Sequence, residues 1–154
     1  MPLAKFVYKM QSILNIKYKL EEQEKSKYRL AHQKYLESLD VLEDFKQRKR
    51  NYEKQYKELM NGRLDILELN FCKRSIDIWK DKIFYQEQVV SKRLDDENRA
   101  RESLNEVMKE RKIYEKLREK AFEDFLMELN EEEKKEIDEL VSYTYNKPQT
   151  NEED

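Results

Sequence analysis

The feature that most constrains this chain is the near absence of residues that turn a polypeptide. It has one glycine and two prolines among 154 residues, and both prolines, Pro2 and Pro148, lie near the ends. Sheet folds and enzyme loops use these residues to turn the chain, so a barrel, a sandwich and a dinucleotide-binding fold are excluded. The remaining break is Asn61–Gly62, which is a turn signal. We therefore predict an all-α chain with one bend.

The positions of these breaks predict the extent of two long helices. The first covers about residues 5–60, and the second covers about residues 64–142. The turn lies at about 61–63, where Gly62 is expected to take the left-handed conformation that ends many helices. A short loop makes two helices antiparallel neighbours, so residues 1–145 are expected to form a single coiled-coil hairpin. Residues 146–154 read as a disordered tail.

The spacing of apolar residues supports a coiled coil. They recur in steps of three and four, from Phe6 to Leu59 and again from Leu69 to Leu129, as in a heptad repeat. Only 38% of residues are hydrophobic and 43% are charged, so the apolar residues can line a narrow seam but cannot fill a globular core. Folding about Gly62 pairs residue i with roughly residue 124 − i. Polar residues interrupt the middle of the seam, where this rule suggests a pairing of Glu24 with Arg101.

An apolar stripe continues beyond the end of the first helix. The pairing rule sets Phe6 opposite about Arg118, and the second helix overhangs beyond that point. The stripe there consists of Phe122, Phe125, Leu126 and Leu129. Because the rule leaves these residues without a partner inside the chain, we predict that they bind another protein. The alternative is self-association.

A second apolar row lies near the turn. Phe71, Ile78 and Tyr85 recur every seven residues, two places off the seam, and should point outward. Tyr52 and Tyr56 lie on the facing helix near the same end. We predict that these five residues form a docking face. The alternatives are that the twist of the hairpin buries them or that the domain dimerises there.

The sequence predicts no catalytic, cofactor or metal site. A phosphate-binding loop needs at least two glycines, and no Cys/His metal spacing is present. His32 reads as a solvated helix position. Cys72 falls on the seam and reads as a buried small hydrophobe, with a reactive thiolate beside Lys73 and Arg74 as the alternative. We therefore expect a protein that is not an enzyme and has no small-molecule substrate.

The charge and hydropathy of the chain limit the kinds of partner that it can bind and the part of the cell in which we expect it. The chain has 32 basic and 34 acidic residues, a net charge of -2, and the signs are interspersed, which disfavours binding to nucleic acid. No apolar run approaches the ~18 residues of a membrane span. The N-terminus does not resemble a signal peptide, and a lone cysteine suits the cytoplasm.

Two segments resemble a known family. The N-terminal FVYKMQSILNIKYKLEEQEKSKY, with its ordered phrase F-x-x-x-M-Q-S-I-L-N-I-K, resembles the opening of the flagellar export protein FliJ. The ending ERKIYEKLREKAFEDFLMELNEEEKKEIDELVSYTY is similar to the close of that family. The likeness extends from about Phe6 to Tyr145.

This resemblance implies a role in flagellar type III protein export. It implies a two-helix stalk that docks in the hexameric export ATPase FliI and promotes ring assembly. It also implies contacts with the cytoplasmic domain of the gate protein FlhA and with export chaperones, at the cytoplasmic face of the inner membrane. A stalk of a virulence-type secretion system and a generic structural coiled-coil adaptor remain alternatives.

Overall fold

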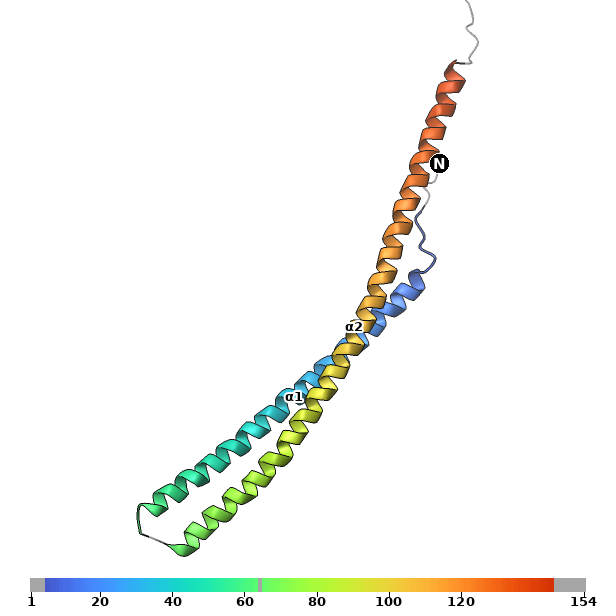
Figure 1. The fold of residues 1–154 in the computed structure, drawn as a ribbon. Helices are drawn as coiled ribbons and strands as arrows, with labels where there is room; N and C mark the ends of the chain where they lie inside the picture. The colour runs from blue at the N-terminus through green and yellow to red at the C-terminus, as the bar shows by residue number, and fades with distance from the viewer. Residues whose placement is uncertain (1–4, 64, 146–154) are drawn as a thin grey trace, which may run out of the picture. The chain divides into compact units, whose positions relative to one another are not determined.

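Two long helices make up the fold. The computed structural model describes residues 5–63 and 65–145, and within them it has the helices α1 (Gln11–Met60) and α2 (Ile66–Tyr145) and no strand. The helices pack against each other in opposite directions (Figure 1), which confirms the predicted all-α hairpin. The predicted tail at 146–154 lies outside the described residues.

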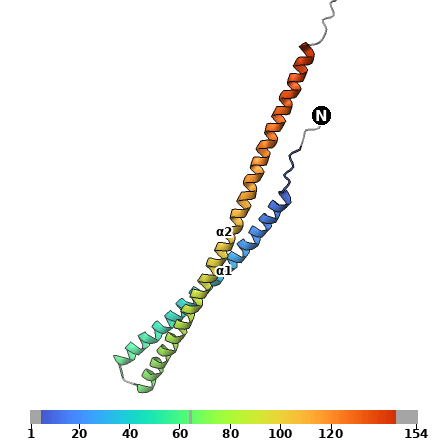
Figure 2. The same ribbon diagram turned by 45° about the vertical axis from the view of Figure 1, so that its right-hand side comes forward.

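The contacts within the chain fall into two units. The turn unit is Lys19–Met108, and the terminal unit joins the residues up to Tyr18 with those from Lys109 onward. Each unit contains a stretch of α1 and an antiparallel stretch of α2. In the terminal unit, the N-terminal residues drawn in dark blue run beside the orange stretch of α2 (Figure 2).

The described residues of the reversal between the helices include no left-handed residue. The amide nitrogen of Asn61 donates to Lys57 O at 3.2 Å, and that of Gly62 donates to Leu59 O at 3.4 Å. No described residue has a positive φ, so the conformation predicted for Gly62 is wrong. A Cβ at this position would meet only Glu58 O, at an ordinary 3.6 Å.

A side-chain cap sets the first turn of α2. Asp65 Oδ1 accepts a hydrogen bond from the amide of Leu67 at 3.0 Å, and Glu68 lies in the first helical turn. An aspartate satisfies amides that have no helical partner, and an acidic residue three positions later favours the positive end of the helix dipole. The helix therefore begins at Ile66, two residues after the predicted start.

Helix α1 begins later than its apolar spacing predicts. It starts at Gln11, and Lys5–Met10 form no helix. No acidic residue stands in its first turn. The amide of Gln11 donates to Tyr8 O at 3.0 Å, a single turn at the helix entrance. Lys5–Met10 therefore do not continue the helix, and their backbone follows a non-helical path.

The seam of the turn unit follows the predicted register only near the turn. Phe45 packs against Trp79 with ring centroids 5.2 Å apart, and Gln86 Nε2 donates to Ser38 O at 3.0 Å. Farther along, Arg101 reaches Tyr28 and Glu97 rather than Glu24, and Glu24 pairs with Lys27. The Glu24–Arg101 prediction is wrong because contacting helix faces advance in steps of three and four residues. A fixed rule that pairs residue i with residue 124 − i therefore fails at a distance from the turn.

The core is small and partly polar. The buried hydrophobic residues among those described are Leu14, Leu42 and Cys72. The buried polar residues are Glu21, Ser38, Ser75, Gln86 and Glu97. A two-helix pair buries only one narrow face of each helix. Many large apolar side chains therefore stay exposed.

Candidate partner-binding surfaces

The outer face of α2 near the turn carries an exposed apolar row. Phe71, Ile78 and Tyr85 are 60%, 53% and 68% exposed. They lie on one side of α2 because a spacing of seven residues is close to two helical turns. We call these residues, with Tyr52 and Tyr56 of α1, the tip surface.

The two tyrosines of the tip surface are more buried than the α2 row. Tyr52 and Tyr56 are half-buried. The ring of Tyr52 packs edge-on against Phe71, with centroids 6.2 Å apart. The structure thus brings Tyr52 and Phe71 together across the helix pair, and the row continues along α2 through Ile78 and Tyr85. Phe84, which is 65% exposed, adds a further ring that the heptad count did not single out.

The second predicted surface lies on α2 in the terminal unit. It consists of Phe122, Phe125, Leu126 and Leu129, and we call it the C-terminal surface. Phe122 and Leu126 are exposed, whereas Phe125 and Leu129 are half-buried.

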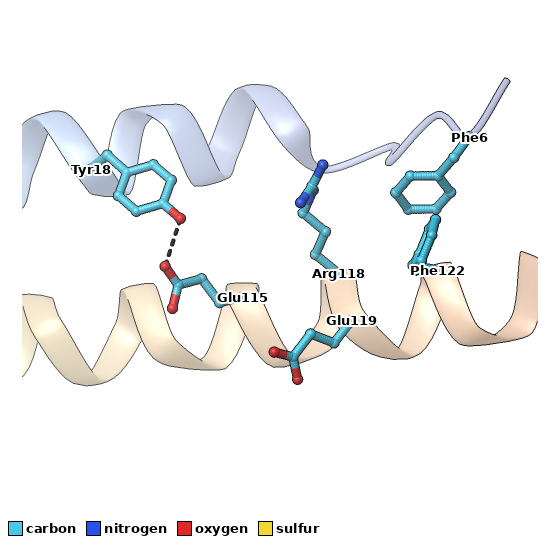
Figure 3. Close-up of a pocket in the computed structure, with 6 residues that line it drawn as sticks. All are labelled: Phe6, Tyr18, Glu115, Arg118, Glu119 and Phe122. Atoms are coloured by element: carbon cyan, nitrogen blue, oxygen red, sulfur yellow. Dashed lines mark hydrogen bonds between the residues drawn. The ribbon is translucent and has the colours of Figure 1, made fainter.

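The prediction that the C-terminal surface lacks any partner inside the chain is wrong. The ring of Phe6 packs edge-on against Phe122 at 5.1 Å between centroids (Figure 3). The centroid of the same ring lies 5.6 Å from that of Phe125. Arg118 stacks over the same ring at 5.8 Å, as the pairing rule expected. The reach beyond Arg118 follows from the missing helix at Lys5–Met10, because extended backbone advances about 3.3 Å per residue against 1.5 Å in a helix.

A polar network lies next to this aromatic cluster. Tyr18 Oη donates to Glu115 Oε1 at 2.6 Å (Figure 3), and Arg111 Nη1 donates to Glu115 Oε2 at 3.0 Å. Lys17 Nζ contacts Glu110 at 2.7 Å. The Tyr18–Glu115 and Lys17–Glu110 contacts join the two helices of the terminal unit at its surface, whereas Arg111 and Glu115 both lie on α2. Water weakens each pair there.

The network shifts the pKa values of its members. The hydrogen bond from Tyr18 lowers the pKa of the Glu115 carboxyl, and Arg111 lowers it further. The same bond raises the pKa of the Tyr18 hydroxyl, because ionised Tyr18 would face a carboxylate. Glu110 raises the pKa of Lys17. All three groups therefore stay in their bonded forms at neutral pH.

The turn unit has its own polar layer, centred on Glu97. Arg101 Nη2 donates to Glu97 Oε1 at 2.8 Å, and His32 Nδ1 lies 3.3 Å from Glu97 Oε2. His32 stacks on Tyr28 with ring centroids 6.0 Å apart. His32, predicted to be a solvated helix position, lies on α1 with its side chain 45% exposed, and one ring nitrogen faces a buried carboxylate.

Other candidates for chemistry find no support in the described part of the chain. Cys72 is fully buried, which removes the access that a reactive thiolate needs. No group of histidine, cysteine and acidic side chains within residues 5–63 and 65–145 is placed to hold a metal ion. None of the described helices is long and apolar enough to cross a lipid bilayer.

The charge of α2 is a signal that the sequence analysis missed. Residues 119–143 contain ten acidic and only three basic residues, although the whole chain is nearly neutral. Counting charge in short windows rather than over the chain would have found it. The C-terminal surface is thus an apolar stripe in acidic surroundings.

These features define a class of protein before they define a family. The chain is an antiparallel two-helix pair with exposed apolar rows, an arrangement typical of proteins that bind other proteins. The protein-family model described as Flagellar FliJ protein matches residues 6–150. The chain therefore belongs to the FliJ family, whose members are components of the flagellar export apparatus. No curated protein and no solved structure shows a significant match to the chain.

Proposed function

We propose that this protein is the coiled-coil stalk of the flagellar export machinery. In this proposal it docks in the ring of the export ATPase FliI through Phe122, Phe125, Leu126 and Leu129, and it promotes assembly of the hexamer. The tip surface contacts the cytoplasmic domain of the gate protein FlhA and the export chaperones. The protein acts at the cytoplasmic face of the inner membrane.

The observation that carries the proposal is the exposure of large apolar side chains on both units of a FliJ-family helix pair. Exposed apolar rows lower the free energy of a complex when a partner covers them. Their arrangement in two separate places suits a protein that contacts two different partners.

The helix pair also suggests how a stalk acts on a ring. Its two helices differ in sequence, so it cannot present the same side chains to six equivalent subunits. It would bind the subunit conformations with unequal affinity and shift their populations. This differential binding is the proposed source of stimulated ATP hydrolysis.

The first test measures ring assembly. Adding the purified chain to the cognate export ATPase should raise the hexamer fraction in analytical ultracentrifugation and raise the rate of ATP hydrolysis. The Leu126→Ser variant should weaken both effects because it removes an exposed apolar contact of the C-terminal surface. Leu30→Ser, an exposed leucine of the turn unit, is the matched control and should behave as wild type. Unchanged hexamer content and hydrolysis with the wild-type chain would refute the ring proposal.

The second test measures gate binding. Replacing Phe71, Ile78 and Tyr85 together by serine should weaken binding to the FlhA cytoplasmic domain at least about tenfold, since it removes three exposed apolar side chains. The matched control replaces Leu30, Leu36 and Val41, which are also exposed on the turn unit. Circular dichroism must show equal helicity in both triple variants. Equal gate binding by both would exclude the tip surface as the docking face.

A further inference from the structure

The non-helical segment Lys5–Met10 lies along α2, and we call it the strap. Phe6 is half-buried, whereas its neighbour Val7 is 77% exposed. The Phe6 ring enters the cluster of Arg118, Phe122 and Phe125. The strap therefore presents one ring to the C-terminal surface and leaves its adjacent side chain in water.

The strap is weakly held. Apart from the Phe6 ring, its hydrogen bond to α2 runs from Tyr8 Oη to Tyr114 O, at a long 3.3 Å. Tyr8 O and Met10 O of the strap accept hydrogen bonds from the amides of Gln11 and Leu14, at the start of α1 and not on α2. Fixing the backbone of each residue in such a segment costs conformational entropy, and this cost opposes the free energy gained by burying one ring. We therefore expect the bound and released positions of the strap to be close in free energy.

The chemistry of the strap indicates what the site accepts. Phe6 is flanked by Lys5 and Lys9. Lys9 lines an apolar groove that also contains Asp124 and Glu128, together with Leu117 and Phe125. The groove is thus lined by apolar and acidic side chains of α2 and by Phe6 and Lys9 of the strap. An aromatic side chain flanked by lysines lies beside acidic side chains of α2, which indicates an aromatic residue in a basic segment as the kind of ligand that this face accepts.

We infer that the Phe122–Phe125 face of α2 is an exchangeable binding site, which holds the chain's own Phe6 in the free protein and takes an aromatic residue from a basic segment of a partner. The inference rests on the proposed function, in which the export ATPase binds this face. The strap then competes with the partner. Binding requires its release, so the free protein is held in a state of lower affinity.

The first experiment tests the strap without any partner. Phe6→Ser should release the strap, and Val7→Ser is the matched control because Val7 is exposed. Trypsin should cleave after Lys9 at least about threefold faster in Phe6→Ser than in wild type, because an open segment is the form that is cleaved. Val7→Ser should be cleaved at the wild-type rate. Equal rates in all three proteins would show that Phe6 does not hold the strap.

The second experiment tests exchange with the partner. Phe6→Ser should bind the export ATPase about three- to tenfold more tightly than wild type, since no strap must be displaced, and Val7→Ser should bind as wild type. The double variant Asp124→Asn and Glu128→Gln should bind more weakly and with less dependence on salt. If Phe6→Ser bound equally or more weakly than wild type, exchange would be refuted while the proposed function stood. If the wild-type chain did not bind the ATPase, the proposed function itself would fail.

Discussion

The turn unit and the terminal unit pair the same two helices by different means. In the turn unit, helix packs on helix around Leu42 and Cys72, with Phe45 against Trp79 and a buried layer at Glu97. In the terminal unit, Leu14 is buried, and surface hydrogen bonds and the Phe6 ring add contacts between the N-terminal residues and α2.

The difference shows what happens where one helix of a coiled coil runs out. An apolar face needs a cover along its whole length. At the N-terminal end of α1, the strap continues to cover α2. A non-helical segment covers the same length with fewer residues than a helix would, but it makes fewer contacts. We therefore expect the terminal unit to be the part of the molecule in which an exchange of binding partners costs the least free energy.

The largest expected effect is a loss of stability in the terminal unit that leaves the turn unit unchanged. Leu14 is fully buried in the terminal unit, and Leu14→Ala should destabilise it by about 2–5 kcal/mol through lost burial and a cavity. Hydrogen exchange should speed up at residues 11–18, while amides of the turn unit keep their rates. Ile16→Ala, at an exposed neighbour, should have little effect. Equal acceleration in both units would mean that they open together.

A smaller effect is expected from the buried polar layer of the turn unit. Glu97→Leu should raise the free energy of unfolding by about 1 kcal/mol, because a buried charge is replaced by an apolar side chain. Arg101, which is half-exposed, can be solvated after the loss of its partner. Urea denaturation measures the change, with the exposed Glu102→Leu as control. A loss of more than about 1 kcal/mol would show that the Glu97 pairs stabilise the seam.

The smallest expected effect concerns the pH dependence of the terminal unit. Tyr18→Phe should move the pKa of Glu115 up toward the ordinary 4.5, because the bonded hydroxyl lowers it. Carbon-detected NMR titration measures this shift. Tyr8→Phe is the control, since Tyr8 bonds a backbone carbonyl and not Glu115. An unchanged Glu115 titration in Tyr18→Phe would exclude the hydroxyl as the cause.

The directions of these pKa shifts determine the pH range in which the polar network stabilises the terminal unit. A lowered carboxyl pKa stabilises the fold above the ordinary value of 4.5, and the effect is lost as pH falls through the pKa of folded Glu115. The raised pKa of Tyr18 stabilises the fold below its ordinary value of 10.0, and that effect is lost as pH rises through the folded value. Surface exposure keeps both effects small.

Local signals account for the parts of the structure that were predictable. The scarcity of glycine and proline left room for little but helices, and the spacing of Phe45, Cys72 and Trp79 placed them on the seam. Asp65 and Glu68 formed a readable helix start that the analysis overlooked, and the charge of residues 119–143 was equally readable. The predicted partner roles of the tip and C-terminal surfaces stay predictions, since only binding measurements test them.

The sequence by itself determined that this chain forms two antiparallel helices with a narrow seam, because backbone hydrogen bonding and apolar periodicity are local properties. Only the tertiary structure decided that α1 starts at Gln11 and that Phe6 lies on Phe122 and Phe125. Periodicity alone favoured a helix at residues 5–10. Contacts with a segment more than a hundred residues away selected an extended path instead, and no local pattern encodes such a contact.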